Sequence, residues 1–139
     1  MSSISFFSED IVYTLKNKIK VRKWIATAIS AEGFTLKELN FIFCSDEYLL
    51  RYNKEFLKHD TLTDVITFDN SEVNSEIFGD IFISIPRVIE NAEIFNVTSE
   101  NELHRVMIHG ALHLLGYSDK GKSAKAKMTF KENFYLNLR

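Results

Sequence analysis

The sequence has one cysteine, one proline and five glycines among 139 residues. Cys44 has no partner for an intrachain disulfide, which excludes a disulfide-stabilised scaffold and predicts a reducing, cytoplasmic location. The longest apolar runs, such as 41–44 and 111–115, are far shorter than the ~20 residues that span a bilayer. Residues 1–10 lack the pattern of a secretory signal. We therefore expect no membrane partner.

The composition is that of a globular protein. Hydrophobic residues make up 45% and charged residues 26%, which excludes global disorder because disordered chains combine low hydrophobicity with high net charge. The length predicts a single domain over residues 1–139. The net charge is only −2, but basic residues concentrate in 16–23 and 120–139, while 69–102 is acidic. This distribution allows local phosphate binding, although such runs are more often solvated helix faces.

Hydrophobic spacing and turn residues predict an α+β fold, with a small mixed sheet of about four strands packed with helices. A polar hairpin connection is expected at 72–76, and the strand order cannot be read from the sequence. Strands are predicted at 38–45, 65–68 and 79–85, and in at least one of the stretches 4–7 and 11–15. Helices are predicted at 16–32 (with Ile19, Ile25, Ala28 and Ile29 on its apolar face), 46–57, 87–95, 99–115 and 123–138.

The segment from His109 to Asp119 carries the chemistry. On a helix, His109 and His113 are one turn apart, so both imidazoles project from one face and can reach one cation. Gly116 ends the helix, and a left-handed turn there brings Asp119 toward the same cation. Three protein ligands with a fourth position for water are typical of a catalytic zinc site. By contrast, His104 lies off this face and is expected to be an ordinary surface or boundary residue.

The spacing matches the long zincin signature, His-Glu-x-x-His-x-x-Gly-x-x-His, at all but two positions. Gly110 replaces the Glu that acts as general base in metalloproteases of that type, which disfavours a zinc peptidase. Asp119 replaces the third His. A carboxylate oxygen is a ligand that zinc accepts, but its negative charge makes a coordinated water a weaker acid.

The motif His-Gly-x-Leu-His-Leu-x-Gly-Tyr resembles the signature of the YbeY family of endoribonucleases. Two further segments agree in order and spacing: 63–68 resembles the family's Thr-Asp-Val-Leu-Ser-Phe strand, and 79–84 resembles its Gly-Asp-Ile strand. Asn53, ten residues before the first of these strands, and 102–103, before the His helix, also match. The resemblance therefore extends over about 40–117.

This resemblance implies a metal-dependent, single-strand-specific endoribonuclease. Family members act at the 3′ end of small-subunit ribosomal RNA and in ribosome quality control. The resemblance implies one Zn²⁺ ion, a zinc-activated water and single-stranded or ribosomal RNA as substrate. It also implies contact with the small ribosomal subunit, and no DNA partner is expected. The predicted metal ligands are His109, His113 and Asp119.

Leu57 departs from the family, which carries at this position an Arg implicated in RNA cleavage. His59 is the nearby candidate for proton transfer, and Lys58 and Arg105 are candidates for binding substrate phosphate. Because Leu57 cannot bind phosphate, the alternative is a ribosome-associated zinc-binding module without nuclease activity. Candidate platforms for base stacking are Tyr48, Tyr52 and Tyr117.

Overall fold

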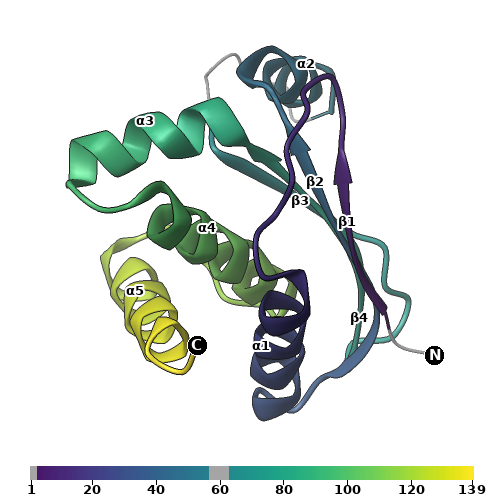
Figure 1. Ribbon diagram of the computed structural model, residues 1–139. Helices are drawn as coiled ribbons and strands as arrows, with labels where there is room; N and C mark the ends of the chain where they lie inside the picture. The colour runs from purple at the N-terminus through teal and green to yellow at the C-terminus, as the bar shows by residue number, and fades with distance from the viewer. Residues whose placement is uncertain (1–2, 57–62) are drawn as a thin grey trace.

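The computed structural model describes residues 3–56 and 63–139, which form a four-stranded sheet covered by helices (Figure 1). The strands are β1 (Ser3–Ser8), β2 (Thr35–Cys44), β3 (Val65–Asp69) and β4 (Glu76–Ser84). The helices are α1 (Lys18–Ala31), α2 (Asp46–Phe56), α3 (Ile85–Phe95), α4 (Ser99–Leu114) and α5 (Lys122–Leu136). The predicted α+β class is confirmed. No helix in these two ranges is long and apolar enough to cross a membrane.

The sheet has the strand order β1-β2-β4-β3. Strand β2 is parallel to both β1 and β4, whereas β3 runs antiparallel to β4. The predicted polar hairpin therefore exists, and it joins β3 to β4. Ser71 organises this connection by donating a hydrogen bond from its Oγ to the carbonyl of Val73, at 2.6 Å. The mixed sheet of four strands is confirmed.

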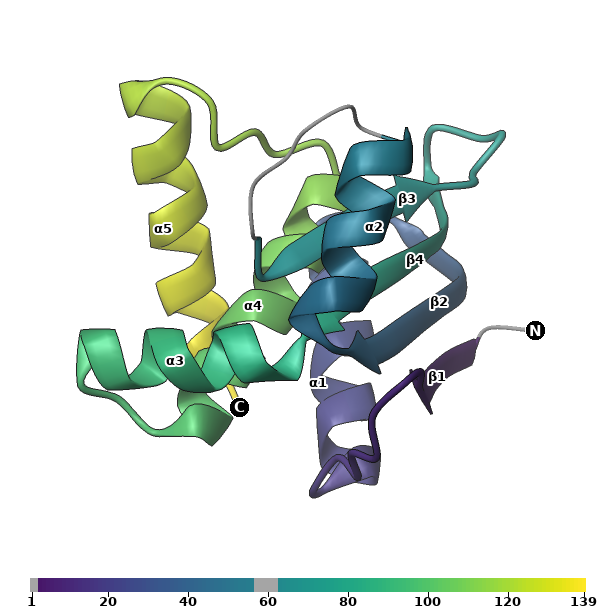
Figure 2. The same ribbon diagram turned by 90° about the horizontal axis from the view of Figure 1, so that it is seen from above.

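Helices pack on both faces of the sheet. Phe41 and Ile81 belong to the larger core, which α1 and α4 cover. Figure 2 shows α4 between the sheet and α5. On the opposite face, Leu49 of α2 packs with Ile42 and Phe82. Both faces of β2 are therefore buried, because α2 covers the second one.

The apolar face of α1 differs from the prediction at one position. The predicted residues Ile25, Ala28 and Ile29 are buried, as expected for a stripe that repeats every 3.6 residues. The assignment of Ile19 to this face is wrong, since its side chain is 82% exposed. At 100° per residue, position 19 lies about 120° from Ile25 around the helix, so Ile19 points away from the sheet.

Helix α4 approaches the sheet closely at Gly110. A Cβ atom there would lie 2.9 Å from Cγ2 of Ile81, which is fully buried on β4. The helix begins where predicted, because the Thr98 side chain accepts a hydrogen bond from the backbone N–H of Asn101, at 3.0 Å. The helix backbone therefore rests directly on the strand, and this contact determines where His109 stands.

We expect Gly110→Ala to lower the free energy of unfolding by about 1–3 kcal/mol, because the added methyl group overpacks the site against Ile81. Alanine has the higher helix propensity, so the substitution would stabilise a helix that lacked this contact. Urea denaturation measures the change. As a control, Ser123→Ala on the exposed first turn of α5 should alter stability by no more than about 0.5 kcal/mol. An unchanged or more stable Gly110→Ala protein would contradict the close approach.

Candidate metal centre

The three predicted metal ligands meet at the C-terminal end of α4. Nε2 of His109 lies 3.0 Å from Nε2 of His113, and Oδ2 of Asp119 lies 3.4 Å from both nitrogens. In a tetrahedral zinc site with bonds of about 2.0–2.1 Å, two ligand atoms are separated by about 3.3 Å. The three atoms therefore match one face of such a site and leave its fourth corner for another ligand.

Gly116 brings Asp119 to this place. It adopts φ 99° directly after the helix, and its N–H donates to the carbonyl of His113, at 3.0 Å. The N–H of Tyr117 donates to the carbonyl of Leu112, also at 3.0 Å. These two bonds form a Schellman motif, which reverses the chain at the helix end. The predicted role of Gly116 is confirmed.

Hydrogen bonds determine which ring nitrogens face the triad. Nδ1 of His109 lies 2.6 Å from Oε2 of Glu132, and Nδ1 of His113 lies 3.0 Å from the carbonyl oxygen of Tyr117. Carboxylates and carbonyls only accept, so both Nδ1 atoms carry hydrogen. In the neutral rings, each Nε2 then presents a lone pair to the other. Two such lone pairs 3.0 Å apart repel each other unless a cation or a proton lies between them, so the donor set suits a metal ion.

Glu132 was missed by the sequence analysis. It lies on α5, 23 residues after His109, and no local spacing connects the two. Burial alone would raise the pKa of Glu132, but hydrogen bonds from His109 and Arg105 outweigh burial and lower it. The carboxylate therefore stays charged. Such a partner orients a ligating imidazole and raises its basicity.

Arg105 was predicted as a cation for substrate phosphate. Its guanidinium donates to Oε1 of Glu132 at 2.8 Å and to Oδ1 of Asn133 at 2.7 Å. It thus extends a chain of contacts from α4 through Glu132 to His109. Phosphate binding by Arg105 stays a prediction. Leu57, Lys58 and His59 lie outside the described residues.

Asp64 interacts electrostatically with His109, and Glu102 interacts with Asp64. Burial raises the pKa of Asp64 and the pKa of Glu102, which is 4% exposed. The pKa of His109 would fall through burial, but Glu132, Asp119 and Asp64 outweigh burial and raise it. The surroundings of the triad therefore favour positive charge at His109.

Gly110 stands at the position where a zinc peptidase has its catalytic glutamate. Gly110 faces Ile81 and the sheet, so a glutamate could not be accommodated there, which agrees with the argument against a zinc peptidase.

The expectation that His104 is a surface or boundary residue is wrong. It is buried, with 8% exposure, because α1 and the end of α5 cover that side of α4.

We expect Glu132→Gln to weaken metal binding by about 10- to 100-fold, since an amide is a poorer partner for Nδ1 of His109. Competition with a chromophoric chelator measures the affinity. Glu93→Gln, an exposed substitution on α3, is the matched control and should leave the affinity unchanged. If the Glu132 and Glu93 variants bound metal equally well, the hydrogen bond to His109 would have no role in the site.

Metal affinity should fall as the pH is lowered, because a proton and the metal compete for Nε2 of His109. The pKa of His109 is raised above its ordinary value of about 6.5, so this loss should begin above pH 6.5. Affinity should level off above the raised pKa. Titration of metal binding between pH 5.5 and 8.5 tests this. In Glu132→Gln the midpoint should move to lower pH, and an unmoved midpoint would contradict the assignment.

Comparison with known proteins identifies the family of this chain. A family model described as Endoribonuclease YbeY matches residues 4–138. An Endoribonuclease YbeY of Cytophaga hutchinsonii is 53% identical, and the match covers 99% of this chain and 96% of the relative. An Endoribonuclease YbeY of Amoebophilus asiaticus is 46% identical, and the match covers 97% of this chain and 92% of the relative. A solution structure of a Thermotoga maritima protein is 30% identical, with a TM-score of 0.66, and the match covers 97% of this chain and 87% of that one. The chain belongs to the YbeY family of endoribonucleases.

Proposed function

We propose that this protein is a zinc-dependent endoribonuclease that cleaves single-stranded RNA. One observation carries the proposal: in a chain of the YbeY family, two imidazoles and a carboxylate converge with their lone pairs on one point. Two nitrogens and one oxygen form a ligand set that zinc accepts. A zinc ion, when bound, supplies a Lewis acid for the phosphoryl group and a nucleophilic water at neutral pH.

The chain's own side chains would hold the substrate beside this ion. The Tyr117 ring is half-buried two residues before Asp119, and Nζ of Lys127 and of Lys131 lie 5.7 and 5.9 Å from its centroid. An aromatic ring beside the cation of Lys127 suits a base and its phosphate in a single strand, whereas Lys131 already pairs with Glu32, at 3.0 Å. Tyr48 and Tyr52 instead pack against Phe82 on the other face of the sheet.

The proposed biological role follows from the family resemblance. We place the activity in the maturation of ribosomal RNA at the 3′ end of the small-subunit molecule and in ribosome quality control. The partners would be single-stranded RNA and the small ribosomal subunit, in the cytoplasm. In this proposal residues 1–139 act as one domain.

We expect His109→Ala and His113→Ala each to abolish zinc binding and RNA cleavage together, because two ligands of the triad hold the ion too weakly. Elemental analysis of the purified protein and cleavage of a labelled single-stranded RNA are the two measurements. Asp119→Ala should lose zinc as well. His59→Ala should keep its zinc and cleave more slowly, which separates metal binding from proton transfer. Full cleavage by a zinc-free His109→Ala/His113→Ala protein would end the proposal.

Leu57 favours a second candidate function, because the family's Arg at this position is implicated in cleavage. In that case the protein is a ribosome-associated zinc-binding module. Zinc-loaded protein that binds ribosomes but leaves single-stranded RNA intact, with and without chelator, would support the module. Cleavage that a chelator stops would support the nuclease.

A further inference from the structure

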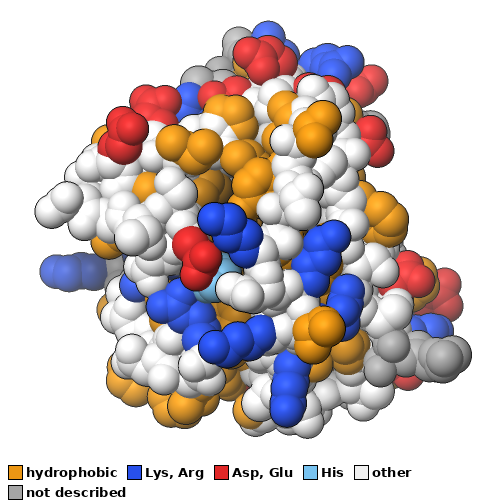
Figure 3. Space-filling view, in the orientation of Figure 1, with side chains coloured by type: hydrophobic (Ala, Val, Ile, Leu, Met, Phe, Trp, Pro, Cys, Tyr) orange, Lys and Arg blue, Asp and Glu red, His pale blue; other side chains and the backbone are white. Residues whose placement is uncertain are grey.

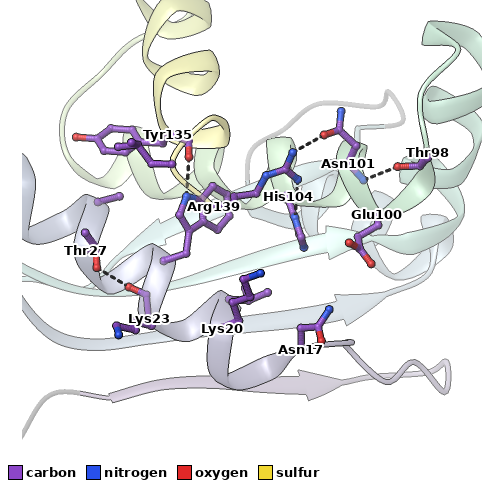
Figure 4. Close-up of a pocket in the computed structure, with 14 residues that line it drawn as sticks. Asn17, Lys20, Lys23, Thr27, Thr98, Glu100, Asn101, His104, Tyr135 and Arg139 are labelled. Atoms are coloured by element: carbon purple, nitrogen blue, oxygen red, sulfur yellow. Dashed lines mark hydrogen bonds between the residues drawn. The ribbon is translucent and has the colours of Figure 1, made fainter.

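A second site lies on the other side of α4. A cavity of about 580 Å³ opens between α1, the first turns of α4 and the end of α5 (Figure 4). His104 lines it, five residues before His109, so the two side chains leave the helix about 140° apart. Because of this angle, the cavity is separate from the metal centre. Lys and Arg side chains gather on the face formed by α1, α4 and the end of α5 (Figure 3).

Arg139 contributes a positive charge to this cavity, and hydrogen bonds to uncharged groups hold its guanidinium in place. Its guanidinium donates three hydrogen bonds, all to uncharged acceptors: the carbonyl of Leu136 at 2.9 Å, Oδ1 of Asn101 at 2.8 Å and Nδ1 of His104 at 2.8 Å. No carboxylate in the described part of the chain forms an ion pair with it. The guanidinium is thus positioned for an anion that the protein does not itself provide.

His104 adds a hydrogen-bond donor. A guanidinium only donates, so Nδ1 of His104 accepts from Arg139 and the ring hydrogen is on Nε2. Burial and the charge of Arg139 lower the pKa of His104, which keeps the ring in this neutral form. Among residues 3–56 and 63–139, no group accepts a hydrogen bond from Nε2. His104, which is 92% buried, therefore presents to the cavity an Nε2–H donor that has no acceptor among the described residues.

The remaining lining residues define the chemistry of a ligand. Lys20 and Lys23 come from α1, and neither forms an ion pair with a described carboxylate. Glu100 is the one acidic side chain that lines the cavity, so with Arg139 the cations outnumber the acids by three to one. Trp24 contributes to an apolar wall. A volume of this size suits a small ligand, since such pockets typically enclose about 300–1,000 Å³.

We propose that this cavity binds the phosphate of a nucleotide, with its nucleoside against the apolar wall. Arg139, His104 Nε2 and Lys20 are the donors for the phosphate oxygens. The ligand is either a free nucleoside monophosphate or one nucleotide of a single-stranded RNA, because both present the same groups. The site is distinct from the triad and does not depend on nuclease activity.

Trp24 makes the site measurable, because it is the chain's only tryptophan and it lines the cavity. We expect saturable changes in its fluorescence when the zinc-loaded protein is titrated with uridine 5′-monophosphate, and weaker binding of inorganic phosphate. Uridine, which has no phosphate, should bind at least about tenfold more weakly than the monophosphate. Comparison with a short oligouridylate identifies the source: tighter binding of the oligomer indicates an RNA strand, and tighter binding of the monophosphate indicates a free nucleotide.

Charge-removing variants test whether the cavity itself is responsible. Lys20→Gln/Lys23→Gln should lower the affinity for the monophosphate about tenfold or more. Lys16→Gln/Lys18→Gln removes the same charge nearby, from residues that do not line the cavity, and should change affinity less than about twofold. All four lysines are exposed, so both proteins should fold, which circular dichroism verifies. Absence of a saturable change, an equal response to uridine, or equal effects of the two double variants would overturn the proposal.

Discussion

The candidate metal centre depends on one hydrogen bond, between Glu132 and His109. It joins α5 to α4, determines which nitrogen of His109 carries the hydrogen, and leaves the other nitrogen free to face His113. Arg105 holds the second oxygen of the same carboxylate, so the orientation of the ring is fixed through two successive contacts. Without this chain the imidazole would be free to rotate, and three lone pairs would not meet at one point.

Successive residues of α4 are rotated by 100° around the helix axis, so its side chains face three different environments. Gly110 lies against the sheet, where only a hydrogen atom fits above Ile81. His109 and His113 project to the metal centre, and His104 projects into the cavity between α1 and α5. These three sides of the helix therefore face the sheet, the metal centre and the cavity. This explains why a glutamate beside His109, which a zinc peptidase requires, has no place in this fold.

Much of the fold could be predicted because its signals are local. Thr98 caps α4 at the predicted start of this helix, and Gly116 turns the chain after its end as expected; both act on the backbone within a few residues. The triad was found for the same reason, since a helical repeat and a glycine turn place His109, His113 and Asp119 within eleven residues. The errors concern burial. His104 is covered by α1 and the end of α5, which lie far from it in the sequence.

The sequence by itself determined the helices, the strands and the three residues that meet at the end of α4, because short-range backbone geometry is enough to bring them together. Only the tertiary structure decided the strand order, the partner of His109 and the position of Arg139 beside His104. These contacts join residues 23 and 35 positions apart, or strands that helices separate in the sequence. No local spacing in a sequence encodes such contacts, since they form only when elements that are distant in the sequence pack together.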